Sequence, residues 1–171
     1  MRINLTHSEI VERANNYPAH EEKDAALYSC MKAAVKRGYM SRDDLIEIAK
    51  WKWRGSRTKN LCEKNTESDV NQITAVSFTT GSERLRIGAL LTLDGVRWPM
   101  ASVILHFAFP DKYPILDVMV MKAVGGSTHY TFEKWEKYVE LCRSKVDTYD
   151  DITIRMLDKA LWLTGKNLDS Y

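Results

Sequence analysis

Residues 90–125 read LLTLDGVRWPMASVILHFAFPDKYPILDVMVMKAVG. The pair Asp94-Gly95 predicts a tight turn, because glycine adopts backbone conformations that other residues avoid. Apolar segments precede and follow this pair. We therefore predict a helix, a hairpin at residues 94–97, a second helix and a loop. A lone carboxylate, Asp117, then stands among apolar neighbours at the start of another helix, and the rest of the chain is expected to pack around this arrangement.

Helix signals also fill the chain before the hairpin. Thr6 and Glu9 have the spacing of a capping box, in which each residue bonds the backbone of the other. Gly38 is suited to the position after a helix, and Pro18 to a position beyond one. We predict helices from the Thr6 cap to before Pro18, over 21–37, from Ser41 to Gly55, over 57–65, from Thr66 to Gly81, and over 82–94. The expected inward side chains include Leu45, Ile46, Ile48, Ala49 and Trp53 in the third of these, and Val70, Ile73, Val76 and Phe78 in the fifth.

Further helices are predicted after the hairpin. Pro99 fits the first turn of a helix over 98–109, where its missing amide hydrogen has no consequence, and Pro110 marks the end. Other helices are expected over 117–124, 131–146 and 151–165, the last with Ile154, Leu157 and Leu161 on one face. No convincing alternating strand pattern occurs. The prediction is an all-α, single helical domain over residues 1–171, with the helix-hairpin-helix and the following Asp at about 85–125.

Composition limits the classes of protein. The chain has 171 residues, of which 44% are hydrophobic and 28% charged, as in ordinary globular domains. No apolar run approaches the roughly 20 residues that cross a bilayer, and the first residues lack a signal-peptide pattern, so no membrane partner is expected. Cys30, Cys62 and Cys142 are widely spaced and odd in number, which argues against a disulfide framework or a zinc site. A reducing cytoplasmic location is the expectation.

Basic residues concentrate between positions 50 and 64. This segment contains six lysines and arginines and only one acidic residue, Glu63. The first four, Lys50, Lys52, Arg54 and Arg57, are interleaved with Trp51 and Trp53. This pattern fits a surface that contacts phosphates. It equally fits a solvated helix end whose tryptophans pack inward.

Asp117 admits two interpretations. Aspartate is among the preferred N-cap residues, so the carboxylate could simply cap the helix that follows it. It could instead be a charged group in a binding groove, because the N-terminus of a helix favours the ionised form of a carboxylate. A helix over 98–109 spans about 18 Å, and an extended loop over 110–116 spans up to roughly 24 Å. The chain can therefore return Asp117 to the hairpin.

The segment over about 85–125 resembles the helix-hairpin-helix base-excision DNA glycosylase superfamily, which includes endonuclease III. That superfamily has a leucine-rich helix, a hairpin of the form L-x-G-V-G, a helix with early small residues and, after a loop, a functional aspartate. Leu93-Asp94-Gly95-Val96 resembles the hairpin, Ala101-Ser102 supplies the small residues, and Asp117 stands at the aspartate position. The interval of 22 residues between Gly95 and Asp117 matches the endonuclease III branch.

Three departures narrow what the resemblance implies. Arg97 replaces the second hairpin glycine, which either disturbs the amide geometry or places a cation at a phosphate. Pro99 stands where the lyase branches carry a nucleophilic lysine, so no Schiff base can form there. The four-cysteine iron–sulfur motif is absent from the sequence. The resemblance therefore implies a monofunctional glycosylase without lyase activity or cluster, or a relative with another function.

The resemblance implies a role for several residues. Asp117 would be catalytic, stabilising the positive charge that develops on deoxyribose or positioning water. Gly95, Val96 and Arg97 would hold a DNA phosphate, with Lys50, Lys52, Arg54 and Arg57 extending the contact, and the hairpin could also hold a monovalent cation. Candidate walls of a pocket for a flipped base are Trp51, Trp53, Tyr39, Trp98 and Tyr113. No metal is expected, and His106 and His129 are assigned no catalytic role.

Three functions remain in competition. The first is a DNA glycosylase that uses Asp117 for base excision. The second is a non-catalytic DNA-binding module, and the third is a protein-interaction domain on the same scaffold. The sequence does not identify a base, a lesion or an oligomeric state.

Overall fold

The structure, a computed structural model, describes residues 1–18 and 21–168. Within those ranges it contains ten α-helices and no β-strand, which confirms the all-α class. The chain divides into two compact units. Unit 1 comprises Met1–Ala19 and Pro110–Tyr171, and unit 2 comprises His20–Phe109. This division falls between the hairpin and Asp117, and the assignment of residues 1–171 to a single domain stays a prediction.

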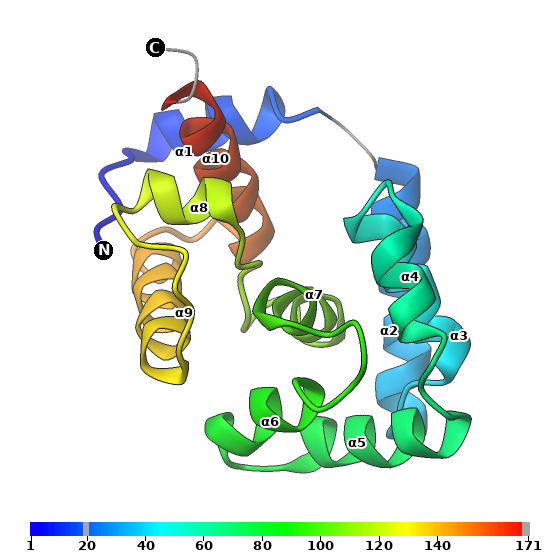
Figure 1. Cartoon of the computed structure of the whole chain (residues 1–171). Helices are drawn as coiled ribbons and strands as arrows, with labels where there is room; N and C mark the ends of the chain where they lie inside the picture. The colour runs from blue at the N-terminus through cyan, green and yellow to red at the C-terminus, as the bar shows by residue number, and fades with distance from the viewer. Residues whose placement is uncertain (19–20, 169–171) are drawn as a thin grey trace. The chain divides into compact units, whose positions relative to one another are not determined.

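Unit 2 contains the hairpin and the basic segment. Its helices are α2 (Glu21–Arg37), α3 (Arg42–Lys52), α4 (Ser56–Cys62), α5 (Glu67–Thr79), α6 (Glu83–Leu90) and α7 (Trp98–Ala108). Helix α3 packs against both α2 and α4, and α5 packs against α6 (Figure 1). Helix α7 packs against α2, α3 and α6. Each of these helices corresponds to one predicted from the sequence, with ends shifted by a few residues.

Helix α7 is buried on all sides. Every residue from Met100 to Ala108 is buried, as expected for a helix that is apolar around its whole circumference. Its two polar residues in this stretch have partners. The hydroxyl of Ser102 donates to the carbonyl of Pro99 at 2.8 Å, and His106 Nε2 lies 2.9 Å from the Tyr28 hydroxyl. His106 is therefore a packed residue, as its apolar neighbours in the sequence suggest.

Two of the predicted inward side chains point to solvent instead. Val76 is 43% exposed and Trp53 is 44% exposed. On α5 the buried face consists of Val70, Thr74 and Ser77, which share one side of the helix. Thr74 can take a buried position because its hydroxyl donates to the Val70 carbonyl at 2.6 Å and accepts from the Met40 amide at 2.9 Å. Trp53 lies beyond the last turn of α3 in extended backbone, which turns it off the apolar side.

Unit 1 brings the first and the last helix of the chain together. It contains α1 (His7–Asn15), α8 (Val118–Ala123), α9 (Phe132–Val146) and α10 (Ile154–Asn167). Helix α10 packs against the other three, and Figure 1 shows α1 beside it. The predicted apolar face of Ile154, Leu157 and Leu161 is buried, and the capping box of Thr6 and Glu9 is present. Both predictions are confirmed.

The contact between α8 and α10 is unusually close. A Cβ atom at Gly165 would overlap the carbonyl group of Met119, so only glycine allows the two backbones to meet there. The segment from 118 to 124 is partly β-branched, yet it forms a helix, because Asp117 caps its start and Val120 and Met121 pack inward. The cap and the packing of α8 on α10 thus fix the position of Asp117 within unit 1.

Candidate nucleic-acid interface

The hairpin is a tight turn centred on Asp94 and Gly95. The Val96 amide donates to the Leu93 carbonyl at 3.1 Å. Gly95 has a φ of +79°, which is the value that the third residue of a type II turn requires. The sequence placed the turn at residues 94–97, and the closing hydrogen bond places it one residue earlier. Glycine is needed here because side chains disfavour this backbone conformation.

The hairpin rests directly on α4. An ideal Cβ on Gly95 would lie 2.8 Å from Cys62 Sγ, 2.9 Å from the Cys62 nitrogen and 3.0 Å from the Thr58 carbonyl oxygen. The side chain of Asn65 closes the contact: its amide donates to the Asp94 carbonyl at 2.9 Å, and its oxygen accepts from the Asp94 amide at 2.9 Å. The hairpin therefore packs against α4, the helix that carries Arg57 and Lys59 of the basic segment.

Arg97 lies at the exposed end of this turn. It is the N-cap residue of α7 in extended backbone, with Pro99 in the first turn behind it. The side chain is exposed and makes no hydrogen bond or ion pair with any residue that the structure describes. No side chain within the described ranges caps α7, so its first amides keep their partial positive charge. Arg97 and the end of α7 together present positive charge to solvent.

The basic residues of the segment differ in their surroundings. Lys50 Nζ lies 2.6 Å from Glu47 Oε1, a hydrogen bond and ion pair that raise the pKa of Lys50. Lys52 Nζ lies 5.9 Å from the centre of the Trp53 ring. Arg54 and Arg57 are exposed and have no ion-pair partner in the described part of the chain. Two of the four predicted phosphate ligands are thus unengaged cations, and Lys50 is balanced by a carboxylate.

The five aromatic candidates for a base pocket differ in their surroundings, and their sharing of one pocket stays a prediction. Tyr113 is 2% exposed, and its ring stacks on Trp135 in unit 1 at 5.9 Å between centroids. Trp51 is fixed by a hydrogen bond from its ring nitrogen to Asp24 at 2.9 Å. The Arg37 guanidinium lies 5.0 Å from the Tyr39 ring. Trp98 follows the hairpin in the sequence and is partly buried. Trp53 is the most exposed tryptophan.

Asp117 caps α8. Its Oδ1 atom accepts from the Met119 amide at 2.8 Å and from the Val120 amide at 3.1 Å. The capping interpretation is therefore confirmed, and the carboxylate is partly buried. Tyr130 is a neighbour of this carboxylate. Burial raises the pKa of Tyr130, and the nearby Asp117 carboxylate raises it further. The buried Tyr130 hydroxyl has no hydrogen-bond partner among the residues described.

The geometry thus assembles one part of the predicted site and leaves another open. Gly95, Val96 and Arg97 join the basic segment within unit 2. Asp117 belongs to unit 1, so its sharing of a groove with the hairpin stays a prediction. Asn65 and Tyr130 were not selected from the sequence, because only tertiary packing brings Asn65 to the hairpin and Tyr130 close to Asp117. Lys23 and Lys59 were not selected either, and they lie together in a hollow beside α4.

No known protein family, curated protein or solved structure matches this chain. The glycosylase resemblance therefore rests on the motif alone. Across residues 1–18 and 21–168, no three or more His, Cys, Asp or Glu side chains gather as metal ligands. Nor does any helix described there combine the length and apolar character needed to cross a bilayer. Cofactor use, the cytoplasmic location and a cation at the hairpin stay predictions.

Proposed function

We propose that the protein binds double-stranded DNA through the hairpin surface, which we define as Gly95 and Arg97 with Arg57 of α4. Val96, which was predicted to hold phosphate, is excluded because it is fully buried and its amide donates to the Leu93 carbonyl. The observation that carries this proposal is the seating of Gly95 on α4 beside an unengaged Arg97. Backbone amides at a helix N-terminus and a nearby guanidinium suit a phosphate, which arginine can grip with two parallel hydrogen bonds. Such contacts position a protein on a duplex without reading its sequence.

A charge reversal tests the duplex proposal. Arg97→Glu removes one cation and adds an anion where a phosphate would sit, so the affinity for a labelled duplex should fall at least tenfold in fluorescence anisotropy. Lys137→Glu is the matched control, because it makes the same change of net charge at an exposed position of α9 in unit 1. Equal affinities of the two variants would contradict the proposal.

Base excision by Asp117 is a second candidate, favoured by how that carboxylate is held. It is partly buried and fixed by two amide hydrogen bonds, so it could stabilise a positive charge that develops on a bound sugar. Pro99 supports a monofunctional hydrolase over a lyase. The chemistry would release a base by hydrolysis of its N-glycosidic bond and leave the DNA strand intact.

Asp117→Asn separates catalysis from folding. Asparagine is an equally good N-cap, so it should preserve α8 while removing the charge. We expect base release from one member of a panel of damaged duplexes, and loss of that release in Asp117→Asn with unchanged duplex affinity. Duplex binding without release from any lesion would leave the non-catalytic binding module. Absence of DNA affinity at moderate salt would favour the protein-interaction alternative, for which Val76 on α5 and Leu85 on α6 are exposed apolar residues, 43% and 49%.

A further inference from the structure

A positively charged hollow lies on unit 2, beside α4. Its volume is about 550 Å³, and α2, α3, the turn after it and α4 all contribute to its walls. The lining residues are Lys23, Lys50, Trp51, Trp53, Arg54, Gly55, Ser56 and Lys59. Half of them are lysine or arginine, and no carboxylate is among the described side chains that line the hollow. A concave surface with charges of one sign concentrates ligands of the opposite sign.

The charges of the hollow are only partly balanced. Lys50 pairs with Glu47 and Lys59 pairs with Glu63, each at 2.6 Å. Lys23 and Arg54 make no ion pair or hydrogen bond within the part of the chain that the structure describes. They come from α2 and from the α3–α4 turn, so two separate elements direct unpaired cations into one space. Phosphate groups would supply the missing negative charge.

An exposed indole adjoins these cations. Trp53 is 44% exposed and lines the hollow. Exposure of so large an aromatic ring is unfavourable, because its apolar surface stays in contact with water and a ligand that covered it would be stabilised. A nucleobase could stack on the open ring, because every base has a flat aromatic face. Trp53 therefore supplies the stacking surface that the cations lack.

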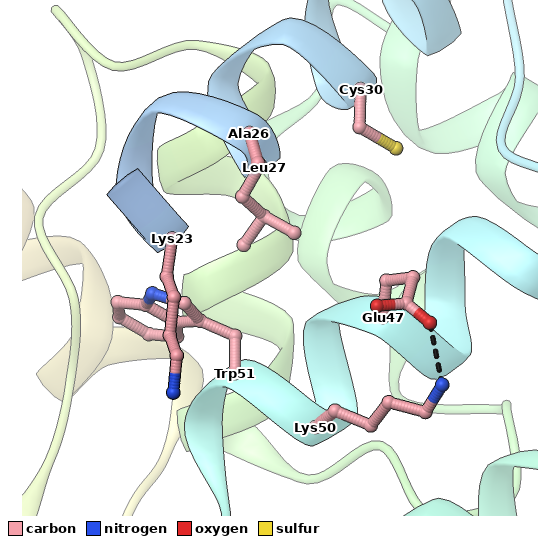
Figure 2. A pocket seen from close by; sticks show the side chains of 7 residues that line it. All are labelled: Lys23, Ala26, Leu27, Cys30, Glu47, Lys50 and Trp51. Carbon is pink, nitrogen blue, oxygen red and sulfur yellow. Dashed lines mark hydrogen bonds and ion pairs between the residues drawn. The ribbon is translucent and has the colours of Figure 1, made fainter. Parts of the chain in front are cut away.

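A smaller recess continues the hollow between α2 and α3. Its volume is about 290 Å³, and it shares Lys23, Lys50 and Trp51 with the hollow. Figure 2 shows Ala26 and Leu27 of α2 on one side, with Trp51 and the Glu47–Lys50 pair of α3 on the other. The combination of an apolar recess and a cationic hollow matches the alternation of base and phosphate along a polynucleotide.

We propose that the hollow binds a segment of single-stranded DNA, with an unpaired base on Trp53 and its phosphates at Lys23 and Arg54. The inference deepens the proposed function and takes DNA as the ligand from it. Helix α4 serves both surfaces: Ser56 and Lys59 line the hollow, whereas Thr58 and Cys62 contact the hairpin. Because both surfaces share this one helix, a strand that leaves a duplex at the hairpin can enter the hollow.

The test measures the binding of a fluorescein-labelled oligothymidylate by anisotropy. Trp53→Ala should weaken binding by about 5- to 150-fold, the range found for loss of one base–aromatic stack. Trp53→Phe should restore most of the affinity, and Leu85→Ala, which removes another exposed apolar side chain of unit 2, should leave it unchanged. Circular dichroism shows whether each variant is folded.

Charge is tested on α2 with a matched pair. Lys23→Glu should weaken oligothymidylate binding and reduce its salt slope by about 0.7, the value for one contact with a single strand. Lys32→Glu reverses an exposed lysine of the same helix that does not line the hollow, and should change neither quantity. Equal effects of Lys23→Glu and Lys32→Glu would overturn the proposed phosphate contact.

Three further results would overturn the proposal. One is oligothymidylate affinity that does not depend on Trp53. Another is equal affinity for an abasic oligomer of the same length, because the ligand would then be a polyanion. The third is thymidine monophosphate binding as tightly as the oligomer, because the site would then take a free nucleotide. The duplex assay with Arg97→Glu is scored separately, so failure at the hairpin and failure at the hollow are distinguishable.

Discussion

The substitution Gly95→Ala examines the contact that joins the hairpin to the basic segment. The added methyl group would lie 2.8 Å from Cys62 Sγ, and 2.9 Å and 3.0 Å from backbone atoms of Cys62 and Thr58. A side chain at a φ of +79° costs about 1–2 kcal/mol, and overpacking against a helix backbone about 1–3 kcal/mol more. The free energy of unfolding should therefore fall by about 2–5 kcal/mol.

Urea denaturation followed by far-UV circular dichroism measures this loss. With a slope near 2 kcal/mol per molar, the midpoint should fall by roughly 1–2.5 M. Gly38→Ala is the control for backbone strain alone, since Gly38 has a φ of +91° and a Cβ there would meet no atom within 4 Å. Gly88→Ala on α6 also meets no atom within that distance and should be stabilising by up to about 1 kcal/mol. If Gly95→Ala is no more destabilising than Gly38→Ala, the hairpin does not rest on α4.

Three other predictions follow from the local chemistry. Asp117→Ala removes the cap of α8 and should lower the free energy of unfolding by about 0.5–2 kcal/mol, whereas Asp117→Asn should leave it nearly unchanged in the same urea assay; equal losses would contradict the cap. Burial would raise the pKa of Asp44, but hydrogen bonds from Cys30 and Ser41 and the charge of Arg37 outweigh it and lower that pKa. The stability from Asp44 is thus present above its unfolded pKa of about 4 and lost as pH falls through the lower folded value, so acid titration of Asp44→Asn should be flatter there than that of the wild type. Burial raises the pKa of Cys30 to about 12 and of Cys62 to about 11, so both thiols should react far more slowly with iodoacetamide at mildly alkaline pH than in urea, and fast native alkylation would refute this.

The sequence was sufficient for the fold class because its helix signals are local. Capping residues such as Thr6, and Gly38 beyond a helix end, act within one turn, so they can be recognised without tertiary information. The hairpin was recognisable for the same reason. Val76 and Trp53 were misassigned because an apolar residue near a helix end reaches the core only if the helix continues in register, and neighbouring helices decide that.

The site was predictable only where it is continuous in sequence. The cluster of basic residues between Lys50 and Lys64 can be recognised directly in the sequence, and so can Arg97. The contributions of Lys23 and Asn65 depend on how α2 and the end of α4 pack, which no local pattern records. The Tyr130 hydroxyl, which has no hydrogen-bond partner among the residues described, lies near Asp117 through packing in unit 1, which no local pattern records either.

The salt dependence of duplex binding tests the hairpin surface most directly. For a protein that neutralises phosphates, the logarithm of affinity falls linearly with the logarithm of salt concentration, by about 0.9 for each contact. We expect Arg97→Gln and Arg57→Gln each to reduce that slope by about 0.9, and the double variant by about 1.8, with Lys137→Gln unchanged. A slope that is the same in the wild type and the double variant would contradict DNA binding at the hairpin.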